Sequence, residues 1–194
     1  GGIYLSTNNG TNWTAVNNGL YILYDTFLTS DGNNLFTQSL NGGLYLSTDN
    51  GTNWITRNNG LGNNNVQALT RSGDNIYAGT YPGGVYLSTN NGANWTQINN
   101  GITYNDLIPI NDISISGNNI FAATSGGGIY LSTNNGTNWS AINNGLTCVI
   151  ISAIAFSGNN IFVGTYWGSL YLSTDNGLTW RNINIGHPVI NILA

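Results

Sequence analysis

Short apolar runs alternate with clusters of Gly and Asn along the whole chain. After Gly60, the pattern predicts strands at 66–70, 76–79, 85–88 and 95–98, with turns rich in Gly, Asn and Pro between them. Each run is short and rich in β-branched or aromatic residues, as is typical of strands bounded by turns. No run reaches the roughly 18–20 residues of a membrane-spanning helix. The pattern therefore predicts an all-β chain without membrane insertion.

The same pattern returns about every 41 residues. Copies of the opening segment Gly-Gly-Ile-Tyr-Leu-Ser-Thr begin near residues 1, 42, 83, 127 and 168. A Trp follows each copy, and the steps between these tryptophans are 41, 41, 44 and 41 residues. Four short antiparallel strands in about 40 residues are typical of one blade of a β-propeller. We therefore predict a single domain over residues 1–194, a five-bladed β-propeller.

A β-solenoid is the structural alternative. Its rungs are usually shorter, and parallel strands do not need a tight Asn-Gly turn inside each repeat. The third strand of a repeat, such as Ile-Tyr-Leu at 129–131, is apolar at successive positions. We expect both of its faces to be buried, as they are when a blade lies between two others. This favours the propeller.

The two ends of the chain fall inside one predicted blade. Residues 3–5 match the third strand of a repeat, and residues 192–194 match part of a first strand. The closing blade is therefore predicted to be shared by both termini and to lack its second strand. Three explanations remain open: residues that are missing, a larger ring, or a strand from another chain. The last implies self-association through the incomplete blade.

The turn between the third and fourth strands repeats as an octapeptide. It reads Ser-Thr-Asn-Asn-Gly-Thr-Asn-Trp at 6–13, with copies at 47–54, 88–95, 132–139 and 173–180. These five box turns resemble the Asp-box, or BNR repeat, Ser-x-Asp-x-Gly-x-Thr-Trp. The resemblance covers nearly the whole chain and implies the scaffold of the sialidase-like propellers.

The box residues are expected to be structural. An Asp or Asn side-chain oxygen can accept hydrogen bonds from turn amides, so Asn in three copies preserves the turn while weakening any case for calcium. The Trp is expected to fix the hairpin between blades. The residues assigned to this scaffold are Asn8, Trp13, Asp49, Trp54, Asn90, Trp95, Asn134, Trp139, Asp175 and Trp180.

The low charge and the scarcity of Cys and His exclude several classes of function. Only 5% of residues are charged, with three Lys and Arg against seven Asp and Glu. Three cations cannot neutralise a phosphate track, which excludes a basic nucleic-acid binder. The single Cys148 excludes an internal disulfide and is expected in the core, and His187 has no second His to complete a metal site. We therefore expect no metal and no cofactor.

Candidate ligand-binding residues follow from the resemblance. It implies that the box turns share one rim, while the loops between second and third strands and those between repeats share the opposite rim, where family members bind substrates. Exposed aromatic faces beside amides and carboxylates suit a sugar, although they could merely cap the blades. The candidates are Tyr81, Tyr104, Asp106, Tyr166, Trp167 and His187.

An enzymatic role is disfavoured. The resemblance to sialidases implies three convergent Arg and a Tyr–Glu pair, but this chain has no Glu, and its three arginines are not expected on one rim. Asp25, Asp106 and Asp112 are the carboxylates left for a glycosidase, which needs a facing pair. We expect a non-enzymatic, secreted, surface-exposed or periplasmic protein that binds carbohydrate or protein. The alternatives are a structural subunit completed by another chain, and a glycoside hydrolase.

Overall fold

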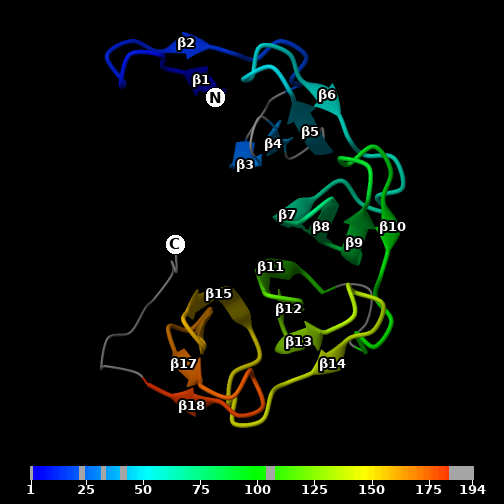
Figure 1. Ribbon diagram of the computed structural model, residues 1–194, viewed down its shortest axis with the longest axis vertical. Coiled ribbons are helices and arrows are strands. Elements are labelled where there is room, and N and C mark those ends of the chain that lie inside the picture. Colours follow the sequence, from blue (N-terminus) through cyan, green and yellow to red (C-terminus); the bar gives the residue numbers. More distant parts are fainter. Residues whose placement is uncertain (1, 22–24, 32–33, 40–42, 104–107, 184–194) are drawn as a thin grey trace.

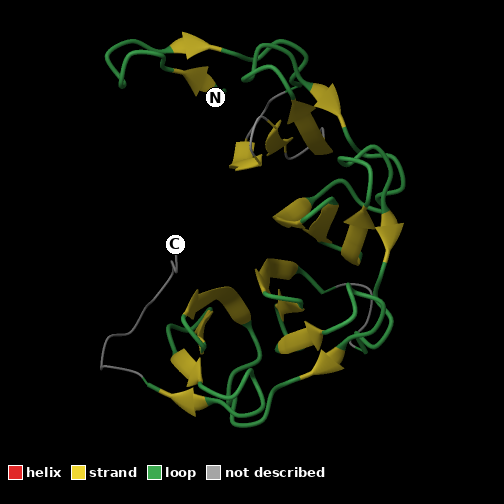
Figure 2. Cartoon of the chain, in the orientation of Figure 1, coloured by secondary structure: helices red, strands yellow, loops and turns green. Residues whose placement is uncertain are grey.

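The computed structural model describes residues 2–21, 25–31, 34–39, 43–103 and 108–183. Every regular element in this part of the chain is a β-strand, as Figure 2 shows. Within it there is no helix of the length and apolar character needed to cross a membrane. The predicted all-β class is confirmed.

Four sheets have four antiparallel strands each, and we number the blades in chain order. Blade 2 comprises β3 (Asp25–Asp31), β4 (Asn34–Ser39), β5 (Gly43–Ser47) and β6 (Ile55–Thr56). Blade 3 comprises β7 (Val66–Ser72), β8 (Asn75–Thr80), β9 (Gly84–Ser88) and β10 (Thr96–Gln97). Blade 4 comprises β11 (Ile110–Ser116), β12 (Asn119–Thr124), β13 (Ile129–Ser132) and β14 (Ser140–Ala141). Blade 5 comprises β15 (Ile151–Ser157), β16 (Asn160–Thr165), β17 (Leu170–Ser173) and β18 (Arg181–Asn182).

The blades are arranged around an axis, as predicted for a propeller. In Figure 1 the first strands β3, β7, β11 and β15 face the middle, and the fourth strands β6, β10, β14 and β18 lie outside. Each sheet pairs its strands in chain order through antiparallel hairpins. Because every turn reverses the chain, the box turns lie at one end of each blade and the loops between second and third strands at the other.

Blade 1 differs from the others. β1 (Tyr4–Leu5) and β2 (Thr14–Ala15) form a two-stranded sheet, and within the described residues β1 pairs with β2 alone. In Figure 1 the described chain forms an arc that is open between this sheet and blade 5. The predicted contribution of residues 192–194 to this blade lies outside the described residues.

The fourth strands are shorter than the sequence predicts. β10 covers only Thr96–Gln97 instead of 95–98. The amide of Trp95 donates to the carbonyl of Asn59 in blade 2, 2.9 Å away, and so leaves its own sheet. Blade-to-blade bonding at Trp95 therefore delays the start of β10 by one residue.

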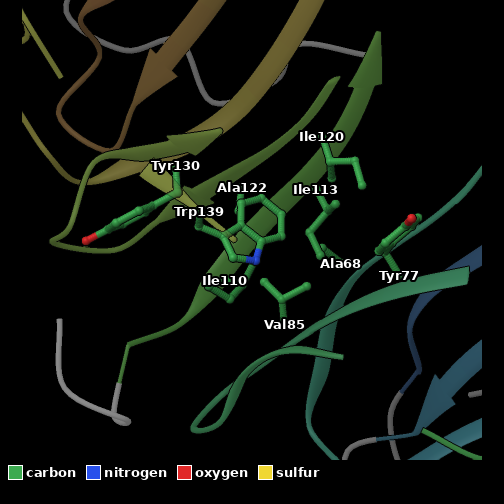
Figure 3. Close-up of a cluster of buried hydrophobic side chains, with 9 residues drawn as sticks. All are labelled: Ala68, Tyr77, Val85, Ile110, Ile113, Ile120, Ala122, Tyr130 and Trp139. Atoms are coloured by element: carbon green, nitrogen blue, oxygen red, sulfur yellow. The ribbon is translucent and has the colours of Figure 1, made fainter. Parts of the chain in front are cut away.

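The core lies between neighbouring blades. Figure 3 shows one cluster, in which the indole of Trp139 lies beside Ala122 of its own blade and faces Val85 of blade 3. The box tryptophans of blades 2 to 5 are all at most 5% exposed. In contrast, Trp13 is 61% exposed, which corrects the expectation that all five box tryptophans are buried between blades. The reason is that no blade in the described residues packs against this side of blade 1.

Candidate ligand-binding rim

The loops between second and third strands lie against the connections between blades. The amide of Tyr81 donates to the carbonyl of Asn65 at 2.9 Å, and the amide of Tyr166 donates to the carbonyl of Ile150 at 3.0 Å. Asn65 and Ile150 directly precede the inner strands β7 and β15. The two kinds of connection therefore meet at one end of the blades. We call this end the loop rim and define it by residues 81–83, 125–128 and 166–169.

Tyr166 and Trp167 form an exposed aromatic pair at the tip of the β16–β17 loop. Their exposed fractions are 63% and 69%, and their ring centroids are 5.2 Å apart with the ring planes at 90°. The buried Thr165 holds this short loop from below. Its carbonyl accepts the Gly168 amide at 3.0 Å, and its Oγ1 accepts the Ser169 amide at 3.0 Å. The structure thus presents two aromatic faces to solvent on an anchored loop.

Tyr81 lies on another blade. It is 41% exposed and precedes Pro82 through a cis peptide bond. Its loop is held by Asn99, whose Nδ2 donates to the carbonyl of Gly83 at 2.8 Å. Blade 4 lies between this loop and the Tyr166–Trp167 pair (Figure 1), and the blade 4 loop at 125–128 has no aromatic residue.

Of the three described candidates, the structure therefore brings two together, Tyr166 and Trp167, and places Tyr81 on another blade. Three further candidates, Tyr104, Asp106 and His187, lie outside the described residues. Cys148, predicted in the core, is a half-buried free thiol in the connection before β15.

Two buried tyrosines support the loop rim from the third strands. The hydroxyl of Tyr86 accepts the Gly62 amide at 3.2 Å, and the hydroxyl of Tyr171 lies 2.6 Å from the Thr147 hydroxyl. Both partners belong to connections between blades. In the sequence, these tyrosines stand in the apolar runs of the third strands, which predict burial but no role for the hydroxyl groups. The available signal was a Tyr with a polar hydroxyl at the same position of every repeat.

Asp112 is a carboxylate on an inner strand. It follows a bulge in β11, at the position that Ala68 and Ala153 occupy in the neighbouring blades. Its Oδ2 accepts the amide of Ile154 in β15 at 2.7 Å, and the Ser114 hydroxyl donates to it at 3.3 Å. Burial raises the pKa of the Asp112 carboxyl, against the opposing effect of these hydrogen bonds. Asp112 therefore joins blades 4 and 5.

Of the three acids considered for hydrolysis, Asp112 is the one whose side chain the structure describes. Asp106 and the side chain of Asp25, the other two acids considered for hydrolysis, lie outside the described residues. Among the described residues, no three His, Cys, Asp or Glu side chains gather as metal ligands.

The box turns show why Asn can replace Asp. Oδ1 of Asn90 accepts the Asn94 amide at 2.9 Å and the Ser88 hydroxyl at 3.0 Å. Oδ1 of Asp49 accepts the equivalent pair of groups, both at 2.8 Å, and its Oδ2 accepts the Asn53 side-chain amide at 2.8 Å. One oxygen is thus enough to close the turn, and the second adds a side-chain contact.

These contacts lower two carboxyl pKa values. Hydrogen bonds from Asn53, first through its backbone and then through its side chain, lower the pKa of Asp49. Those from Thr179, side chain first, lower the pKa of Asp175 to about 2. Both carboxylates therefore remain ionised in moderately acidic solution.

An Asn with a left-handed backbone completes each box turn. Asn91 has φ 55° and Gly92 has φ 76°, and the Ala93 amide donates to the Asn90 carbonyl at 3.2 Å. Positive φ at both central residues is the type I′ geometry, for which Asn-Gly is the preferred pair. The second Asn of the box is thus explained by the backbone, not by a ligand.

The three arginines lie on different blades. Arg71 in β7 pairs with the exposed Asp74 at 3.8 Å, near the turn between first and second strands. Arg181 is in β18, and Arg57 follows β6. The side chain of Arg57 packs under Gly92 of blade 3, and its buried Nε has no hydrogen-bond partner. This dispersed arrangement does not resemble a carboxylate-binding triad.

A cavity of about 320 Å³ lies between blades 2 and 3, away from the loop rim. Phe36, Leu69 and Arg71 are among its lining residues. The described candidates Tyr81, Tyr166 and Trp167 do not line it, and its position near the β7–β8 turn places it toward the box-turn end.

Comparisons with known proteins show the fold. No family model matches the chain, and no curated protein matches its sequence. The structure is similar to an ancestral GH74 enzyme, with a TM-score of 0.73 and 20% identity, over 94% of this chain and 28% of the other. It is also similar to the extracellular domain of a one-component system from B. thetaiotaomicron, with a TM-score of 0.71 and 20% identity, over 94% of this chain and 25% of the other.

A third similar structure is YCF48 bound to D1 peptide. The TM-score is 0.60 and the identity 18%, over 78% of this chain and 52% of the other. The chain thus spans about a quarter to a half of these three structures. At this identity the comparisons establish the β-propeller fold.

Proposed function

We propose that this chain is a non-enzymatic, extracellular propeller of the Asp-box type that binds a carbohydrate or protein ligand through the loop rim. The observation that carries this proposal is the Tyr166–Trp167 pair, two large aromatic side chains more than 60% exposed on one short loop. The box turns supply the scaffold, and the loop rim carries the residues that differ between repeats.

The loop is suited to binding because it is already ordered. Hydrogen bonds to Thr165 hold its backbone, so a ligand need not immobilise it. The perpendicular rings offer two differently oriented apolar faces, against which the C–H faces of a pyranose ring can pack. The same faces could anchor an apolar side chain of a peptide.

The low charge of the chain favours a neutral ligand. With a formal net charge of −4 and only three Lys and Arg, the protein has little to attract an anion. Binding is therefore expected to depend weakly on salt. The similar structures support a ligand-binding role by analogy, since one is a GH74 enzyme, one an extracellular domain and one a peptide-bound protein.

A glycan array and a peptide array, screened with the purified chain, test the proposal. We expect hits that Trp167→Ala or Tyr166→Ala reduces at least about tenfold, with the near-ultraviolet circular dichroism unchanged. Leu178→Ala is the matched control, because Leu178 is 70% exposed but lies in a box turn at the opposite end of the blade. Arrays without hits at high protein concentration, or equal losses in all three variants, would exclude this binding site.

A further inference from the structure

The joint between neighbouring blades is built four times from the same residues. The Tyr of each third strand and the box Trp of one blade pack against the preceding blade. These tyrosines, Tyr45, Tyr86, Tyr130 and Tyr171, are 1–4% exposed. In blade 1 the equivalent residues, Tyr4 and Trp13, are 55% and 61% exposed. Blade 1 thus presents the face that the other blades bury.

The hydrogen bonds of the box tryptophans also distinguish blade 1 from blades 2 to 5. Each buried box Trp donates its indole N–H to a carbonyl of the preceding blade, at 2.6–2.9 Å. The acceptors are Val16, Arg57, Ile98 and Ile142. The indole N–H of Trp13 instead donates to Gly10 in its own turn, at 3.0 Å. Within the described part of the chain, the Trp13 indole N–H therefore bonds inside its own turn and not across a joint between blades.

Blade 5 presents the complementary face. Phe162 and Leu170 occupy the positions of Phe121 and Ile129, which are at most 1% exposed against blade 5. Phe162 and Leu170 themselves are only half-buried. Ile183 occupies the position of Ile142, since the Ile183 amide donates to Leu170 at 2.9 Å as the Ile142 amide does to Ile129 at 3.0 Å. Its carbonyl is the equivalent acceptor for a box Trp.

We infer that the Tyr4–Trp13 face of blade 1 is a docking surface for blade 5 of a second copy of this chain. In this contact the Trp13 indole N–H donates to the Ile183 carbonyl of the other copy, and Tyr4 packs against its blade 5. The four joints inside the chain show that blades of this sequence pack together by these residues. Tyr4, Trp13, Phe162 and Leu170 carry no charge, so like charges do not oppose the contact. The inference does not depend on the loop rim.

The two faces lie on different blades, so the contact is head-to-tail. A copy bound through blade 1 still presents its own blade 5 to the next copy. Such contacts close into a ring if the rotation allows and otherwise give an open chain of molecules.

Sedimentation velocity over a range of concentrations tests the inference. We expect the 194-residue chain to associate reversibly, and Trp13→Ala to raise the dissociation constant at least about tenfold. The matched control is Trp167→Ala, which removes an equally exposed Trp from the loop rim and should leave association unchanged. Tyr4→Asp, which places a charge on the docking face, should also abolish association without removing a buried side chain.

Fluorescence quenching gives an independent measurement. In a Trp167→Phe background, Trp13 is the one highly exposed Trp of the described residues, so acrylamide quenching reports mainly on it. Quenching should decrease as the protein concentration rises, and this decrease should be absent in Tyr4→Asp. If sedimentation shows a monomer at every concentration, the inference is wrong. This holds whether acrylamide quenches Trp13 or another part of the same chain protects it. Association that persists in both Trp13→Ala and Tyr4→Asp would also overturn the inference, because the copies would then associate through another surface.

Discussion

The indole N–H of Trp95 donates a hydrogen bond to the backbone carbonyl of Arg57, 2.9 Å away across the joint between blades 2 and 3. The Trp95 amide donates to Asn59 of the same neighbouring blade, also at 2.9 Å. One box residue thus fixes its blade through both its backbone and its side chain. Gly60 makes this approach possible, because a Cβ there would lie 2.2 Å from the Trp95 carbonyl oxygen.

Removing a buried box Trp should therefore be far more damaging than removing an exposed Trp. Trp95→Ala should destabilise the fold by roughly 3–5 kcal/mol, through an emptied apolar site and a lost hydrogen bond. Trp167→Ala should change stability by no more than about 0.5 kcal/mol, because its side chain is 69% exposed. Urea denaturation of both variants measures the difference in their free energies of unfolding. Similar midpoints would contradict the assignment of Trp95 to the scaffold and of Trp167 to the loop rim.

Arg57→Ile should stabilise the chain. The equivalent positions, Val16, Ile98 and Ile142, place an apolar side chain under the box Gly of the next blade. Arg57 fills this position with the Cβ and Cγ of its side chain, and its buried Nε has no hydrogen-bond partner. Removing an unsatisfied buried donor should gain about 1 kcal/mol, seen as a higher melting temperature. The control is Arg181→Ile, at an exposed position of β18, where no gain is expected.

Asp112→Asn should become increasingly favourable as the pH rises. Burial raises the pKa of Asp112 in the folded protein, so the folded chain holds this proton more tightly than the unfolded chain does. The corresponding stability is present at low pH and is lost as the pH rises through the raised pKa. An Asn keeps an oxygen for the Ile154 amide but does not ionise. The melting-temperature difference between variant and wild type should therefore grow from pH 4 to pH 7, and a constant difference would contradict this.

The box carboxylates should act in the opposite direction. The pKa of Asp175 is lowered to about 2 from its ordinary 3.8, and that of Asp49 is also lowered. Their contribution is present above the ordinary pKa and is lost as the pH falls toward 2. The double variant Asp49→Asn, Asp175→Asn should therefore lose less stability than wild type between pH 4 and pH 2. Asp74→Asn, which removes a fully exposed carboxylate outside the box turns, is the control for general charge effects.

The repeat pattern was sufficient to predict most of the fold. A period near 41 residues, with Asn-Gly turns and a Trp at one place in each copy, indicated four-stranded blades, because short β-branched runs between such turns can pair only with their neighbours in sequence. The strand order and the β7–β9 positions follow from this local chemistry. The role of Asn90 as an acceptor in its turn follows from it as well.

Contacts between repeats could not be predicted in the same way, since the five copies look alike in sequence while their surroundings differ. Trp13 and Trp54 stand at the same place in their repeats, yet Trp13 is 61% exposed and Trp54 3%. The reason is that, among the described residues, a blade packs against Trp54 and none packs against Trp13. Likewise, only the fold shows that Asp112 joins two inner strands and that Tyr81 lies on a different blade from Trp167. The sequence by itself determined the blade, through turn chemistry and strand pairing within about 40 residues. The tertiary structure decided which copies of the same residue are buried and which face solvent, since burial depends on the neighbouring blade.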